Sequence, residues 1–216
     1  MHIGLLSQEL QESHTGETKV QQVVVTTDQQ LDEIIAGCRK NERLAQKALY
    51  EKYFGRMMGI ARRYIKDNED ALEVVNMGFL KIFNNINQFK GIGSFEGWMS
   101  KTIINNSLDF LRANKAYEEQ IQLDKNFDVK YDKLPEKTDY STVDTEKLYL
   151  MIDQLPPMTK MVFNLFAIDG YSHKEIGEKL NISTGTTKWH VSSARQKLKE
   201  LLMLELSNQK ITDENK

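Results

Sequence analysis

The side chains best suited to recognise another molecule lie close to the C-terminus of the chain. At about 100° per residue, a helix over residues 184–202 would place polar side chains on one outer face. That face carries Lys188, Trp189, Ser192 and Ser193, with Arg195 at its edge. Acids are absent from residues 181–199, and residues 171–199 hold six Lys or Arg, two Glu and two His. Phosphates favour such a surface because each cationic contact releases counterions, so the pattern predicts a helix that reads DNA.

The residues that precede this helix have the spacing of a helix-turn-helix motif. Ser172 and Glu175 can form a capping box at the start of a first helix, in which Gly177 leaves room for a second helix to cross. Asn181 can end the first helix at a positive φ angle, and Ile182 can fill the corner. The second helix would have Ser183 or Thr184 as its cap and would bury Thr187, Val191, Ala194, Leu198, Leu201 and Leu202. These offsets are typical of a DNA-binding helix-turn-helix.

A second recognition surface is predicted on an earlier helix that begins near Phe95. Its outer side would carry Trp98, Lys101, Asn105, Asp109 and Arg112, which fall within about 80° of one another. Its inner side would carry Met99, Ile103, Ser107, Phe110 and Leu111. An aromatic ring beside cations and an amide can stack on exposed bases and hold the backbone of a single strand.

Each of these surfaces has a simpler interpretation. The face around Lys188 can be an ordinary solvated helix surface, although such surfaces usually mix acids with bases and rarely expose a tryptophan. Trp189 can instead be buried against a neighbouring helix, and Trp98 can belong to the core. The protein could also be a helix-turn-helix regulator whose first domain senses a signal or dimerises, or a helical adaptor that binds only protein.

The composition favours an all-α protein of one or two domains. Its 216 residues are 28% charged and 40% hydrophobic, include only three prolines, and carry a net charge of −2. The single cysteine, Cys38, excludes a disulfide within the chain and fits a reducing cytosol. No apolar run reaches the roughly 18 residues of a membrane span, and the N-terminal residues lack the pattern of a signal peptide. These features predict a cytoplasmic protein.

The helical patterns divide the chain into two helical domains joined by a flexible linker. The predicted segments are an N-terminal extension (1–27) expected to be disordered, a first domain (28–115), an acidic linker (116–143), a second domain (144–206) and a polar tail (207–216). Counted to Glu146, the linker stretch holds nine acids and four lysines and has little apolar periodicity.

Within the first domain, helical spacing predicts which side chains face the core. After a helix that carries Leu31, Ile34, Ile35 and Cys38 on one face, the next helix would bury Leu44, Ala48, Tyr53, Met57, Ile60, Ala61 and Tyr64. Asp67 or Asn68 would cap the following helix, with acids in its first turn. That helix would bury Ala71, Val75, Phe79, Ile82, Phe83 and Ile86.

Three stretches of the chain resemble the sigma-70 family, in its two-domain extracytoplasmic-function (ECF) group. The stretch ALYEKYFGRMMGIARRYIKDNEDALEVVNMGFLKIFNNINQF resembles the family's regions 2.1 and 2.2. GSFEGWMSKTIINNSLDFLRANK resembles regions 2.3 and 2.4, and the segment from Ile152 to Leu202 resembles region 4. The motifs occur in the family's order with the expected gap between them.

The resemblance implies a region 2 helical bundle, a region 4 helix-turn-helix and a role in transcription. It implies a sigma factor that binds core RNA polymerase and directs promoter-specific initiation through −10 and −35 recognition. Region 2 would dock on the polymerase clamp helices, region 4 would bind the flap, and an anti-sigma factor would be a further partner. The resemblance implies no catalytic activity, no cofactor and no small-molecule substrate.

The resemblance also assigns individual residues by their position in the motifs. The −35 element would meet the recognition-helix residues Lys188, Trp189, Ser192 and Ser193, with Thr184, Thr186 and Arg195 on phosphates. The −10 strand would meet Trp98, Lys101, Asn105 and Arg112, together with the loop 90–95. Polymerase docking would use Glu73 and Asn76. The chain departs from the usual family residues at Met77, Gly78, Ile104, Asn181 and Thr187.

Catalysis is not predicted from the residues themselves. The segment from Gly91 to Gly93 lacks the flanking strand and the lysine of a phosphate-binding loop. The four histidines, at positions 2, 14, 173 and 190, have no metal-ligand spacing. The residues therefore also favour a binding protein without a metal site.

Overall fold

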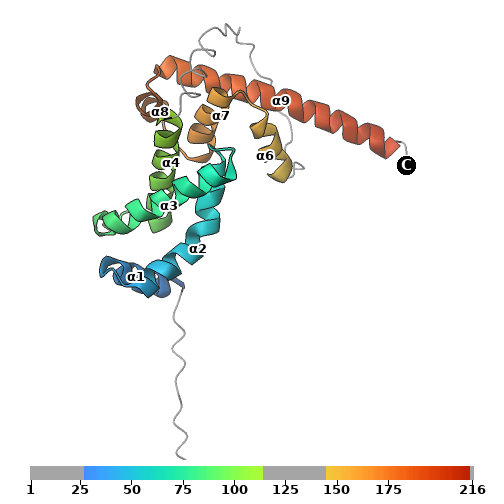
Figure 1. Ribbon diagram of the computed structural model, residues 1–216. Helices are drawn as coiled ribbons and strands as arrows, with labels where there is room; N and C mark the ends of the chain where they lie inside the picture. The colour runs from blue at the N-terminus through green and yellow to red at the C-terminus, as the bar shows by residue number, and fades with distance from the viewer. Residues whose placement is uncertain (1–26, 114–144, 215–216) are drawn as a thin grey trace, which may run out of the picture.

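The computed structural model describes residues 27–113 and 145–214, and every regular element within these ranges is helical (Figure 1). The predicted all-α fold is confirmed. The predictions for the N-terminal extension and for the linker at 116–143 fall on residues 1–26 and 114–144, outside the described ranges.

The described residues 27–113, called the first half below, contain four α-helices. They are α1 (Thr27–Arg39), α2 (Arg43–Arg62), α3 (Asn68–Asn85) and α4 (Phe95–Ala113), with a 3₁₀ turn at Ile86–Gln88 after α3. Helices α3 and α4 pack against each other, and α2 packs against α1, α3 and α4. The largest fully buried side chains here are Leu49, Met57, Phe79, Ile82, Ile86, Met99, Ile103 and Leu108. Burial of each such side chain stabilises the fold by about 1.5–3 kcal/mol relative to exposure, which fixes α4 against α3.

Local signals place the ends of α3 and α4 as the sequence predicts. The Asp67 carboxylate accepts hydrogen bonds from the backbone N–H of Glu69 (2.8 Å) and of Asp70 (3.0 Å), so Asp67 is the N-cap of α3. Before α4, Gly91 and Gly93 have φ angles of 75° and 77°, which L side chains adopt at a cost. These caps and turns fix the point at which the α4 surface begins.

One predicted core residue of the first half is wrong. Leu44 is 83% exposed, and the fully buried leucine of this helix is Leu49. The reason lies in the contact between α1 and α2, where a Cβ atom on Gly37 would come within 2.6 Å of the Ala45 Cβ atom. Ala45 therefore faces α1, and Leu44, one residue away around the helix, points to solvent. Tyr53, Met57, Ile60 and Ala61 are buried as predicted.

The described residues 145–214, called the second half below, contain four further α-helices. They are α6 (Thr145–Asp153), α7 (Pro157–Phe163), α8 (His173–Leu180) and α9 (Thr184–Glu214), and a π-helical turn, η2 (Asn164–Ile168), continues α7. Pro157 occupies the first turn of α7, where its missing N–H leaves no hydrogen bond broken. Helix α9 packs against α6, α7 and α8 and then runs on alone (Figure 1). It continues through residues 207–214, where the sequence pattern indicates only a polar tail.

The two halves lie against each other in this structure. Buried residues of α1–α4 and of α7–α9 form one continuous apolar cluster. A second, smaller cluster lies within the second half, where Ala194, Leu198 and Leu202 meet Met151, Ile152 and Leu155. The end of α2 meets the turn after η2, and α4 meets α8. These interdomain contacts bear directly on the predicted recognition residues of α4.

Candidate nucleic-acid interface

The helix-turn-helix is formed by α8 and α9. The Ser172 hydroxyl accepts from the Glu175 N–H (3.3 Å) and the Glu175 carboxylate accepts from the Ser172 N–H (2.8 Å), which confirms the capping box. Asn181 ends α8 at φ 54° and ψ 45°, in the left-handed region. A Cβ atom on Gly177 would lie 2.8 Å from the Ile182 carbonyl oxygen, so only glycine allows this close turn. The corner is thus built by the residues that predicted it.

The outer face of α9 is the one that the helical wheel predicts. Lys188 and Arg195 are exposed, while Trp189, Ser192 and Ser193 are partly exposed. The residues predicted to face the core are buried or, for Leu201, partly buried: Thr187, Val191, Ala194, Leu198, Leu201 and Leu202. Thr184 is exposed at the start of the helix, and Thr186 is partly exposed beside the Ser183 hydroxyl (2.8 Å). The predicted −35 residues therefore share one continuous, acid-free surface.

Trp189 has an intermediate position on this surface. Its indole ring meets the His190 imidazole edge-on at 4.7 Å between ring centroids, and part of the ring stays accessible. Neither full burial nor full exposure describes it. One side of the ring can still meet a ligand while the other side is held by its neighbour.

His190 does not belong to the cationic surface, although the sequence counts it there. It is only 2% exposed, and its Nδ1 atom lies 3.0 Å from the Thr159 hydroxyl of α7. Burial lowers the pKa of His190 to about 4, so the ring is neutral at physiological pH. The helical wheel contained this signal, because position 190 lies three residues after Thr187 and four before Ala194.

His173, by contrast, lies beside the cationic surface of α9, at the start of α8. Its ring stacks on Phe166 at 4.4 Å, and its Nδ1 atom lies 3.1 Å from the Thr187 hydroxyl. The guanidinium of Arg195 lies 5.9 Å from the centroid of the same Phe166 ring. Partial burial and the charges of Lys188 and Arg195 lower the pKa of His173. Phe166 thus positions two basic groups together, which the sequence pattern did not indicate.

The outer face of α4 is less open than the face of α9. Trp98 is partly buried and packs against the rings of Phe95 (5.6 Å) and Phe89 (5.9 Å), so it contributes to the core as well as to the surface. The neighbouring Asn106 is buried and donates to the Val74 carbonyl (2.7 Å), which ties α4 to α3. These contacts fix the rotation of α4 and leave Lys101, Asn105 and Arg112 on its exposed side.

The predicted −10 residues differ in the partners they already have. Asn105 accepts a hydrogen bond from the Lys179 ammonium of α8 (2.7 Å), and Arg112 donates to the Lys179 carbonyl (3.2 Å). Arg112 also donates to Asp109 within α4 (2.8 Å). The structure therefore brings the predicted −10 residues together on α4 but engages two of them with the helix-turn-helix.

The predicted docking residues lie on the exposed side of α3. Glu73 and Asn76 are exposed, and the Asn76 side chain accepts a hydrogen bond from Tyr50 (2.9 Å). Three large apolar side chains share the exposure of this helix, namely Leu72 (40%), Met77 (47%) and Leu80 (51%). The sequence pattern did not single them out as a surface, because each one alone fits an ordinary amphipathic helix.

The departures from the usual family residues have structural reasons on α3 and α4. Gly78 is buried where α3 meets the side chain of Ile103, so a larger residue at this position would force the end of that side chain to shift. Ile104 is 2% exposed and belongs to the core, so a basic residue at this position would place its charge among apolar side chains.

Two structural findings bear on other functions. Among the residues that the structure describes, no group of three or more His, Cys, Asp or Glu side chains is arranged to hold a metal ion. None of the helices within 27–113 and 145–214 is both long enough and apolar enough to cross a membrane.

The fold and these surfaces define a helix-turn-helix protein with a second helical unit that carries its own basic helix face. Comparison with known families names the class. The family model "Sigma-70 region 2" matches residues 49–117 and "Sigma-70, region 4" matches residues 145–198, which together exceed half of the chain. The chain therefore belongs to the sigma-70 family, as an ECF RNA polymerase sigma factor.

Curated relatives agree with this assignment. The chain is 26% identical over 155 residues to the ECF RNA polymerase sigma factor SigE of Mycolicibacterium smegmatis, which covers 71% of this chain and 60% of the relative. It is 25% identical over 178 residues to the ECF RNA polymerase sigma-E factor of Haemophilus influenzae, which covers 79% of this chain and 92% of the relative. Sigma factors are initiation factors without catalytic activity, so this chain is not an enzyme.

Solved structures also match the chain, at lower identity. CnrH, in its complex with the cytosolic domain of CnrY, matches with a TM-score of 0.44 at 19% identity, over 80% of this chain and 96% of that chain. RpoE of Bartonella quintana, in complex with the anti-sigma factor NepR, matches with a TM-score of 0.44 at 20% identity, over 73% of this chain and 96% of that chain.

The match of residues 49–117 to the family model for sigma region 2 disfavours a sensor or dimerisation domain in the first half.

Proposed function

We propose that this sigma factor reads a −35 element with α9 and a −10 element with α4 while it is bound to core RNA polymerase. The observation that supports this proposal best is the acid-free outer face of α9, held outward by a completed helix-turn-helix. The first domain (28–115) would contact the polymerase and the −10 element, and the second (144–206) would contact the −35 element.

At the −35 element, the recognition helix enters the major groove. Lys188, Ser192 and Ser193 reach base edges, because a helix in this groove presents its outer side chains to the base pairs. Trp189 contacts the groove with the accessible part of its ring. Thr184, Thr186 and Arg195 hold the phosphates on either side, and His173 supports them from the start of α8. The phosphate contacts set the position of the helix, and the base contacts set the sequence.

At the −10 element, the strand lies along the outer face of α4. Lys101 and Arg112 neutralise phosphates, Asn105 offers an amide to a base, and the exposed part of Trp98 offers a stacking surface at the start of the helix. The neighbouring loop 90–95 lines the same path. Because Trp98 is braced by Phe89 and Phe95, its ring is held rigid for stacking.

The exposed side of α3 is the proposed polymerase contact. Glu73 and Asn76 would meet the clamp helices, with Leu72, Met77 and Leu80 as the apolar centre of the contact, and the second half would meet the flap. An anti-sigma factor is a further proposed partner. The structures of CnrH and of Bartonella RpoE each hold a second protein, and the one bound to RpoE is named an anti-sigma factor. The cytoplasm, where core polymerase acts, is the proposed location.

Transcription with purified components tests the proposal. Core polymerase with the wild-type chain should give transcripts from a set of genomic fragments that the core alone does not give. Lys188→Ala together with Trp189→Ala should abolish starts that depend on the −35 element, while binding to the core polymerase persists. Glu73→Ala with Leu80→Ala should weaken binding to the core and leave DNA contacts intact. Loss of core binding in the Lys188 and Trp189 variant would assign that surface to a protein partner instead.

A further inference from the structure

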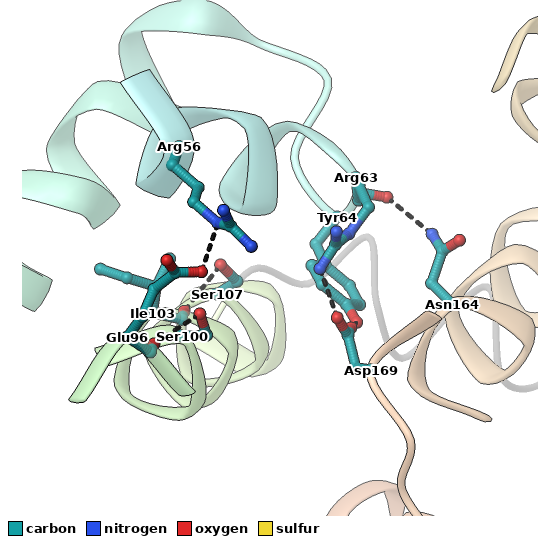
Figure 2. Close-up of polar contacts among 9 residues, drawn as sticks. All are labelled: Arg56, Arg63, Tyr64, Glu96, Ser100, Ile103, Ser107, Asn164 and Asp169. Carbon is teal, nitrogen blue, oxygen red and sulfur yellow. Dashed lines mark hydrogen bonds and ion pairs between the residues drawn. The ribbon is translucent and has the colours of Figure 1, made fainter. Parts of the chain in front are cut away.

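The end of α2 and the turn after η2 meet at a buried ionic contact between the two halves. Figure 2 shows Asp169 of the second half pointing at Arg63 and Tyr64 of the first half, and its carboxylate accepts hydrogen bonds from both. The Asp169 side chain is only 5% exposed and that of Arg63 is 18% exposed. Beside them the Asn164 amide donates to the Arg63 carbonyl (3.2 Å). This group, Arg63, Tyr64, Asn164 and Asp169, is called the junction below.

The junction connects to the contact that engages the −10 residues. Tyr171 lies two residues after Asp169, and its ring carries the Lys179 ammonium at 4.9 Å from the centroid. The same ammonium donates to Asn105, and the Lys179 carbonyl accepts from Arg112. The turn after η2 and helix α8 thus hold the first half at two places, and the second place is the proposed −10 surface.

The junction carries buried charge and incomplete hydrogen bonding. Two buried atoms of the junction, Arg63 Nε and Asn164 Oδ1, and the Oη atom of the neighbouring Tyr171 have no hydrogen-bond partner within the described residues. Burial raises the pKa of Asp169, and burial with the Asp169 charge raises the pKa of Tyr171 to about 12. A buried ion pair adds little stability compared with an apolar contact of the same size, but loss of one partner leaves the other charge buried and unpaired and strongly destabilises the state that contains it.

Like charges also gather at the second contact. Burial is the main cause that lowers the pKa of Lys179, and the nearby charges of Arg112 and Lys101 add to it, although Glu175 and Asp109 oppose them. A strand of DNA would draw these cations to its phosphates and would compete with Lys179 for contact with Asn105 and Arg112. The closed contact and the DNA contact use the same groups, so they exclude each other.

We propose that the junction is an intramolecular latch, which holds a closed form in which α8 masks the −10 surface of α4. This rests on the proposed DNA contact of α4 and adds its regulation. Release of Asp169 separates the halves and frees Asn105 and Arg112. Residues 114–144 have a contour length of roughly 100 Å, which permits the two halves to move far apart while joined.

The first test measures separation of the halves in the free, full-length chain. Dyes at Asn84→Cys on α3 and Gln196→Cys on α9 report their distance, because the native Cys38 is fully buried and its thiol reacts slowly. Asp169→Asn should lengthen the mean distance, and Tyr64→Phe should do so to a smaller extent. Asp153→Asn is the matched control, since Asp153 borders the same interdomain groove of about 840 Å³ but pairs with Lys160 of its own half (2.5 Å). Circular dichroism confirms that each variant remains helical.

The second test measures masking, with a fluorescent 12-nucleotide oligothymidine as the probe. Asp169→Asn should bind it about tenfold more tightly than wild type, and adding Asn105→Ala should remove the gain. Asp153→Asn should bind as wild type. An unchanged dye distance in both junction variants, or an opened variant that binds the oligonucleotide no more tightly, would overturn the latch. The proposed promoter function fails separately, if Asn105→Ala leaves transcription with core polymerase unaltered.

Discussion

The two recognition surfaces differ in what builds them. The surface of α9 is assembled within one stretch, from the cap at Ser172 to the last buried leucine, and its outer side chains face solvent. The surface of α4 depends on distant residues, since Phe89 braces Trp98 and Lys179 engages Asn105. A motif whose parts lie side by side in the sequence forms a complete site by itself, whereas a surface made by tertiary packing can be open or covered.

The largest difference expected between the two halves is the loss of stability of each half in acid. The buried His190 has a pKa of about 4, below its unfolded value near 6.5, so the unfolded state binds more protons between these values. The stability that the neutral ring contributes is complete above pH 6.5 and is lost as the pH falls toward 4. The loss amounts to about 3 kcal/mol, confined to the second half.

Each half has one tryptophan, which allows the measurement. Urea unfolding followed by Trp189 fluorescence in a Trp98→Phe chain should show the loss between pH 7 and pH 4.5. The Trp98 signal in a Trp189→Phe chain should show less. In His190→Gln the extra acid sensitivity of the second half should disappear. An equal acid response with and without His190 would contradict the assignment.

The next effect concerns the helix-turn-helix corner. Gly177→Val places a side chain against the Ile182 carbonyl, where a Cβ atom would already lie at 2.8 Å, and should destabilise the second half by about 1–3 kcal/mol. Recognition of the −35 element should fall with it. Gly55→Ala is the control, because nothing lies within 4 Å of a Cβ atom there. Thermal unfolding and promoter binding with core polymerase give the comparison, and unchanged −35 recognition in Gly177→Val would argue against a tightly packed corner.

The sequence predicts features that neighbouring residues build and fails for features that distant residues build. The corner residues Ser172, Gly177 and Asn181 were predicted correctly, because each performs a local task that depends on the next few residues. Leu44 was predicted to be buried and is exposed, because the choice between neighbouring positions in α2 is made by contact with α1. The junction had no sequence signal, since Arg63 and Asp169 meet only when the halves fold together.

The phosphate contacts provide a smaller test of the two surfaces. Arg195→Ala should lower the slope of log affinity against log salt by about one unit for a duplex that carries the −35 element, with little change in sequence preference. Arg112→Ala should change this slope little in the same assay, because Arg112 belongs to the α4 surface. Fluorescence anisotropy across a salt series, with the chain bound to core polymerase, measures both. Equal changes in slope would show that the two surfaces share one DNA segment.

The smallest expected effect comes from His173, at the edge of the α9 surface. In the free chain, burial and the nearby Lys188 and Arg195 lower the pKa of His173, so its ring is neutral at pH 7. A phosphate beside the ring would raise this pKa, so binding takes up a proton and tightens as the pH falls from 7.5 to 6. The gain should be no more than about threefold, since the ring is partly solvated. His173→Gln should remove this pH dependence and leave affinity at pH 7.5 almost unchanged. A pH dependence that persists in His173→Gln would place the proton on another group. His190 is not a candidate for that group, since it is buried away from the groove.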